Sequence, residues 1–121
     1  MGKLTFDKLE STNVEVNKTI IKCEKIMPKF DRGTSQHTLL INRIRALNLV
    51  KNLIENELNN KHIVYRKQEL EEALVPIESI LHKCLKAQIK HENNSKQYQK
   101  YIPLIDSMLV ARQLIGDVLS I

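Results

Sequence analysis

Apolar residues recur every three or four positions along four long stretches of this chain. Because an α-helix turns once in about 3.6 residues, this spacing lines up one apolar stripe on each stretch. Runs rich in turn residues, at 28–33, 59–61 and 90–94, separate the stretches, so we predict four helices. Their stripes contain, in chain order, Leu9, Val16, Ile20, Cys23 and Met27; Leu40, Ile44, Leu47, Ile54 and Leu58; Leu70, Leu74, Ile77, Leu81 and Cys84; and Tyr101, Ile105, Met108, Ile115 and Leu119.

The chain also matches itself when it is shifted by 61 positions. Residues 4–58 then align with residues 65–119 at 13 identities without a gap, and Lys22-Cys23 falls on Lys83-Cys84. Apolar periodicity explains some of these matches, but it does not explain the repeated Lys-Cys pair or the aligned loops. We therefore predict two tandem helical hairpins that arose by internal duplication. The expected fold is all-α, an antiparallel up-down-up-down four-helix bundle in a single domain, 1–121.

Individual residues predict where helices begin. Thr34 and Ser95 lie 61 positions apart, each after a loop, where a hydroxyl can accept the first free amides of a helix. Pro76 and Pro103 are both expected near the start of a helix. Because Pro103 lies several residues beyond Ser95, it predicts either a kink or a later helix start.

Composition adds a mild basic character. The 121 residues include 19 Lys and Arg against 14 Asp and Glu, a net charge of +5, and aromatic residues make up 4%. Divided at residue 60, the first part has 10 basic and 7 acidic residues and the second has 9 and 7, so neither hairpin is specialised by charge. The surplus suits phosphates, nucleic acid or an acidic protein. The abundance of Lys, Asn and Ile is typical of AT-rich bacterial genomes.

Other features indicate a soluble protein of the cytoplasm. Residues 1–10 lack the apolar core of a signal peptide, and no run approaches the roughly 18 to 20 apolar residues that span a bilayer. We expect no membrane contact. Cys23 and Cys84 lie within apolar stripes, where cysteine usually behaves as a small hydrophobic residue, so we predict two reduced, buried thiols.

Polar residues of interest cluster around the two hairpin loops. In an up-down-up-down bundle both loops lie at one end, which would bring these residues onto one surface. The candidate binding residues are Lys29, Phe30, Arg32, His37, Lys90, His91, Lys96 and Tyr98. A purely structural interpretation also exists, because lysines near the C-terminus of a helix are favoured by its dipole.

Arg32 and His37, separated by four residues, form the sharpest local pattern. An arginine can stabilise the charge that develops during phosphodiester cleavage while a histidine transfers a proton. This spacing resembles the Arg-x4-6-His motif of HEPN-type ribonucleases, which are small helical bundles that usually pair their motifs across a dimer. The pattern departs from that family at Gly33, where a polar residue is usual, and in its position between the first two helices. Asn93 and Tyr98 replace the pair in the second hairpin.

No pattern predicts a metal or a cofactor. The histidines, His37, His62, His82 and His91, lack cysteines or carboxylates at the spacing of a tetrahedral site. The chain has neither a glycine-rich phosphate loop nor a nucleophile elbow. We therefore expect no metal, no cofactor and a non-enzymatic role; Arg32 and His37 are the candidates for catalysis if the chain is an enzyme.

The leading hypothesis is a helical protein-interaction or regulatory module whose partner is another protein. Apolar residues beside the main stripes, among them Leu49, Leu53, Leu109 and Val110, also suggest a homodimer if they form an exposed patch. Nucleic-acid binding through the basic loop end is the alternative. The scarcity of aromatic residues and the interspersed acids weaken that alternative.

Overall fold

The computed structural model describes residues 4–120. Four long helices pack together, and no strand occurs within this part of the chain. The helical elements are α1 (Phe6–Ile26), the 3-10 turn η1 (Met27–Lys29), α2 (Ser35–Leu58), α3 (Lys67–Gln88), the short α4 (Lys96–Gln99) and α5 (Ile102–Leu119). The all-helical prediction is confirmed.

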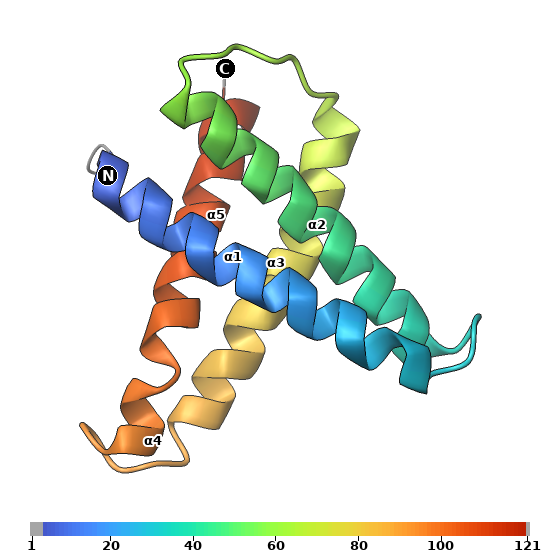
Figure 1. The fold of residues 1–121 in the computed structure, drawn as a ribbon, viewed down its shortest axis with the longest axis vertical. Coiled ribbons are helices and arrows are strands. Elements are labelled where there is room, and N and C mark those ends of the chain that lie inside the picture. The colour runs from blue at the N-terminus through green and yellow to red at the C-terminus, as the bar shows by residue number, and fades with distance from the viewer. Residues whose placement is uncertain (1–3, 121) are drawn as a thin grey trace.

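The helices form two hairpins that cross (Figure 1). The most extensive packing lies within the hairpins, between α1 and α2 and between α3 and α5, and further packing joins α2 to α3 and α1 to α5. In Figure 1 the α1–α2 hairpin lies in front of the α3–α5 hairpin, and the loop tips point to separate corners of the molecule. The loop end of each hairpin therefore projects beyond the region where the hairpins cross.

The core lies where the hairpins cross. Side chains from all four long helices are fully buried there. The largest of them are Leu47, Ile54, Ile77, Met108, Ile115, Val16 and Val50. Most belong to the predicted stripes. The added apolar residues mainly complete this core, since Leu53 and Val110 are buried and Leu49 is half-buried, although Leu109 stays exposed.

The two hairpin loops share the same local chemistry. Thr34 and Ser95 cap α2 and α4, each hydroxyl oxygen accepting a hydrogen bond of 3.2 Å from the amide three residues later. The residue before each cap has a positive φ, 86° at Gly33 and 64° at Asn94. Glycine and asparagine tolerate this left-handed conformation best. The predicted caps are confirmed.

The two prolines differ in their effect. At Pro103 the chain begins a new helix, because α4 ends at Gln99 and α5 begins at Ile102. Pro103 has no amide hydrogen to donate to the carbonyl four residues earlier, so the later start predicted for this segment is what forms. The prediction that Pro76 lies near the start of its helix is wrong. It lies buried inside α3, which begins at Lys67, and the helix continues through it because tertiary packing offsets the missing hydrogen bond.

Candidate functional site

Positive charge is concentrated in the end of the molecule that contains the two loop tips, and the opposite end is slightly negative. The part of each hairpin between the midpoints of its helices spans residues 17–47 in the first and 78–108 in the second. These two segments, which we call the basic half, carry 12 of the 19 basic residues and 5 of the 14 acidic ones, a net charge of +7. The rest of the chain carries 7 basic and 9 acidic residues, a net charge of −2. Net charge is therefore similar in the two hairpins but differs strongly between the two ends of the molecule.

Few carboxylates neutralise the cations of the basic half. Of residues 4–120, the ion pairs join Lys18 to Glu15 at 3.4 Å and Arg66 to Glu69 at 3.0 Å, and the second pair lies outside the basic half. The lysines at the tips are exposed and take part in neither pair. Their charge is therefore available to an external anion.

Four of the candidate residues lie at the first tip. Lys29 ends the turn η1 and is exposed, and Phe30, next to it, is half-buried. Arg32 is exposed on the loop, whereas His37 is half-buried in the first turn of α2. Within the described chain no hydrogen bond joins the Arg32 and His37 side chains. The structure thus provides a basic, partly aromatic corner without a preorganised catalytic pair.

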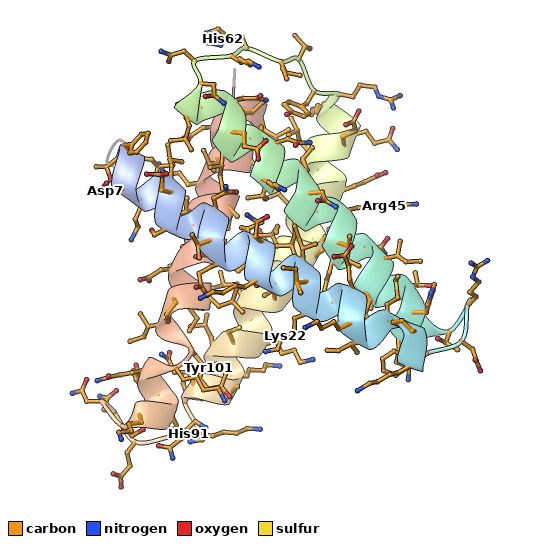
Figure 2. The ribbon with its side chains drawn as sticks, viewed as in Figure 1. Asp7, Lys22, Arg45, His62, His91 and Tyr101 are labelled. Carbon is orange, nitrogen blue, oxygen red and sulfur yellow. The ribbon has the colours of Figure 1, made fainter. Side chains whose placement is uncertain are left out.

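The other four candidates lie at the second tip, where one of them, His91, makes an aromatic contact. The rings of His91 and Tyr101 stack with centroids 6.1 Å apart and planes inclined by 19°, and the Lys100 ammonium lies 5.8 Å from the Tyr101 ring centre. Figure 2 shows His91 and Tyr101 together at this corner. Lys90 and Lys96 are exposed beside them, and Tyr98 is half-buried.

A buried glutamine holds the second tip in place. Gln88, at the end of α3, donates a hydrogen bond of 3.1 Å from Nε2 to the backbone carbonyl of Tyr98. The candidate set omitted both Gln88 and Tyr101. Gln88 lies four residues after Cys84, so helical spacing alone could have predicted that Gln88 is buried on the same face.

The crossing places the two tips apart, so the eight candidates form two groups (Figure 1). Between the groups the lysines of α1 and α3 continue the basic surface towards the crossing. Lys22 lies beside α3 in Figure 2, and its charge acts on the thiol of Cys84 in that helix. The basic half thus comprises two basic tips and the lysines of α1 and α3 that lie between them and the crossing.

A half-buried arginine, Arg43, lies near the two thiols. Burial raises the pKa of Cys23 and of Cys84 above the ordinary value of 9.0, and the positive charge of Arg43 opposes this rise at both thiols. Arg43 reaches α3, where its terminal nitrogen donates to the Ser79 hydroxyl at 3.5 Å, while its buried Nε has no hydrogen-bond partner. Arg43 therefore joins α2 to α3, and its charge also acts on the Cys23 thiol of α1.

The raised pKa values of the two thiols predict that the free energy of unfolding falls at alkaline pH. The folded chain favours the neutral thiols, so their contribution is complete below the ordinary pKa of 9.0 and is lost as pH rises through the higher native values. We expect the free energy of unfolding, measured by urea denaturation, to fall above pH 9 more in wild type than in Cys23→Ala/Cys84→Ala. Equal alkaline slopes in the two proteins would contradict this account.

Three hollows on the surface lie away from the tips. The most voluminous, about 900 Å³, lies beside the 59–66 connection and the C-terminal halves of α2 and α5. None of the three is lined by a candidate residue of the tips.

Within residues 4–120 no three His, Cys, Asp or Glu side chains gather in a way that could hold a metal ion. No helix in this part of the chain is both long and apolar enough to cross a membrane.

Comparisons with protein-family models, with curated proteins and with solved structures find no match for this chain.

Proposed function

We propose that this chain is a non-enzymatic binding protein whose basic half contacts an acidic surface of another protein. The observation that carries the proposal is the net charge of +7 on residues 17–47 and 78–108 against −2 on the rest of the chain. Complementary charge steers association and fixes orientation, and this role needs no catalytic group.

The composition of the surface favours a protein over a nucleic acid. Exposed aliphatic side chains, among them Ile21, Leu85 and Ile89, lie between the lysines of the basic half. A phosphodiester backbone offers them no apolar partner, whereas a protein surface offers both carboxylates and apolar groups. The chain also exposes 8437 Å², more than the roughly 6,700 Å² of a compact monomer of this mass, which supports an open shape with surface available to a partner.

Nucleic acid is the second candidate, and one feature favours it. The His91–Tyr101 stack with Lys100 beside it combines aromatic faces and a cation at one tip. Bases of single strands stack on such faces while lysines contact phosphates. This arrangement occurs at the second tip, whereas the charge surplus extends over both hairpins.

Charge reversal at the tips provides the test. Lys29→Glu/Lys90→Glu/Lys96→Glu is expected to weaken binding of fluorescein-labelled polyglutamate roughly tenfold or more, since each exposed ion pair contributes about 0.2–1 kcal/mol and each reversal adds repulsion. Fluorescence anisotropy at low and high salt measures the change. Lys8→Glu/Lys61→Glu/Lys67→Glu makes the same change in charge at the other end and should bind like wild type.

Two results would reject the proposal. Equal weakening by the two triple variants would mean that net charge alone governs binding. If a labelled single-stranded oligonucleotide of matched charge binds more tightly than polyglutamate, and loses binding in the tip variant, then the nucleic-acid function is favoured instead.

The architecture that carries this function is, we propose, an up-down-up-down bundle produced by tandem duplication. In support, α2 and the α4–α5 segment each begin and end 61 positions apart, and so do the capping hydroxyls and the positive-φ residues before them. Two free, buried cysteines support a reducing compartment such as the cytoplasm.

A further inference from the structure

Cations from three different helices come together where the hairpins cross. Arg43 of α2 donates a hydrogen bond of 3.5 Å from its terminal nitrogen to the Ser79 hydroxyl of α3. Lys83 follows Ser79 by four residues, so both lie on one face of α3, and the Arg43 guanidinium lies against that face. Lys22 extends from α1 over α3 in Figure 2. We call these four residues the crossing cluster.

The buried Cys84 thiol of α3 lies within reach of all three charges. Burial raises the pKa of this thiol above its ordinary value of 9.0, and the positive charges of Arg43, Lys83 and Lys22 oppose the rise. The strongest charges that act on Cys84 are therefore all positive. This agrees with the placement of the three cations around one point of the crossing.

The chain provides these cations with no counter-charge. Within residues 4–120 neither ion pair includes a member of the crossing cluster. The carboxylates nearest to it in sequence, Glu24 and Glu78, are exposed and belong to neither ion pair. In this part of the chain the Ser79 hydroxyl accepts the bond from Arg43 and donates none, and the buried Nε of Arg43 has no partner. An external anion would therefore find three cations and one hydroxyl hydrogen available.

Packing alone does not explain Arg43. The residue 61 positions later is Leu104, which packs half-buried against the core. An apolar side chain therefore suits the corresponding position of the second hairpin, whereas a half-buried guanidinium without a carboxylate costs free energy. A costly polar group of this kind is typical of a binding site. A bound anion would offset the cost, because it would supply charge-assisted hydrogen bonds to the guanidinium.

Because three cations and a hydroxyl donor converge at this point, we infer that the crossing cluster binds a phosphate group. A phosphate dianion has enough charge and enough oxygen atoms to contact a guanidinium, two ammonium groups and a hydroxyl together. A single carboxylate has one charge and two oxygens, so it would leave part of the cluster unpaired. The inference goes beyond the proposed function, because this site does not include the tip lysines and needs no protein partner.

Inorganic phosphate is the first probe, titrated into the protein by isothermal titration calorimetry at pH 8 and constant ionic strength. Arg43→Met should weaken binding about tenfold or more. Lys22→Gln/Lys83→Gln should weaken it roughly three- to thirtyfold. The matched control, Lys25→Gln/Lys86→Gln, removes two exposed lysines three residues further along the same helices and should bind like wild type. Circular dichroism verifies that each variant keeps its helices, which glutamine at exposed helical positions should preserve.

Alkylation of Cys84 by iodoacetamide shows whether phosphate binds at the crossing. A bound phosphate would raise the pKa of this thiol, so its alkylation rate at pH 8 should fall roughly twofold or more as phosphate saturates wild type. Mass spectrometry of the Cys84 peptide measures the rate. At the same phosphate concentration the rate should fall less in Lys22→Gln/Lys83→Gln than in the control variant.

Phenyl phosphate, a monoester, distinguishes the two sources of a phosphate group. Tighter binding of phenyl phosphate than of inorganic phosphate would identify a phosphate ester as the ligand. Tighter binding of inorganic phosphate would identify the free ion. Either result supports the inference, provided that the crossing variants weaken the binding and the control variant does not.

Three results would overturn the inference. One is equal slowing of Cys84 alkylation by sodium chloride at the same ionic strength, which would indicate screening alone. Another is equal weakening of phosphate binding by the crossing variant and the control variant. The third is phosphate binding that leaves the alkylation of Cys84 unchanged, which would place the anion elsewhere. None of these results affects the proposed function, which is tested by polyglutamate and the tip variant, and loss of polyglutamate binding would leave the phosphate site intact.

Discussion

Ile54→Ala and Ile115→Ala are each expected to lower the free energy of unfolding by about 2–5 kcal/mol. Both side chains are fully buried, and they lie 61 positions apart in α2 and α5. Removing most of either side chain loses its burial and leaves a cavity that close-packed neighbours fill only in part. Urea denaturation monitored by circular dichroism measures each change.

The matched control for these core substitutions is Val75→Ala. Val75 is 70% exposed, and Val14, the residue 61 positions earlier, is exposed as well. Truncation of Val75 should therefore change the free energy of unfolding by less than about 0.5 kcal/mol. A small effect at Ile115 beside a large effect at Ile54 would show that the two hairpins do not contribute equivalent parts to the core.

Arg43→Met is expected to raise the free energy of unfolding by about 1–2 kcal/mol, in spite of removing a charged side chain that joins two helices. The buried Nε has no partner, and an unpaired buried donor costs about 1–3 kcal/mol. The bond to Ser79 is long at 3.5 Å, so little is lost with it. Methionine fills a similar space without a polar group.

The same substitution should also slow alkylation of both cysteines by iodoacetamide at pH 8. Arg43 lowers the pKa of the Cys23 and Cys84 thiols, so its removal raises both pKa values and decreases the reactive thiolate. Arg45→Met removes a nearby exposed arginine and should change neither stability nor alkylation. A less stable Arg43→Met protein would indicate that the guanidinium stabilises the crossing of the hairpins.

The apolar spacing was sufficient to predict four helices, because burial of one face imposes a period that the residues display directly. The stripe through Leu9, Val16 and Ile20 is buried in α1, and the one through Leu70, Ile77 and Leu81 is buried in α3. The hydroxyls of Thr34 and Ser95 likewise marked helix starts, since capping depends on neighbours within three residues. The position of Pro76 inside α3 was missed because packing against other helices decides whether a proline is tolerated there.

What only the tertiary structure decided is which residues share a surface. The sequence named the candidate residues of both tips, but the crossing of the hairpins separates them into two groups (Figure 1). Dividing the chain at residue 60 concealed the segregation of charge, because each hairpin folds back on itself and joins the second half of one helix to the first half of the next. The basic half appears when the chain is divided across the hairpins. Local periodicity thus determined the helices, whereas non-local packing at the crossing determined the surface that they present.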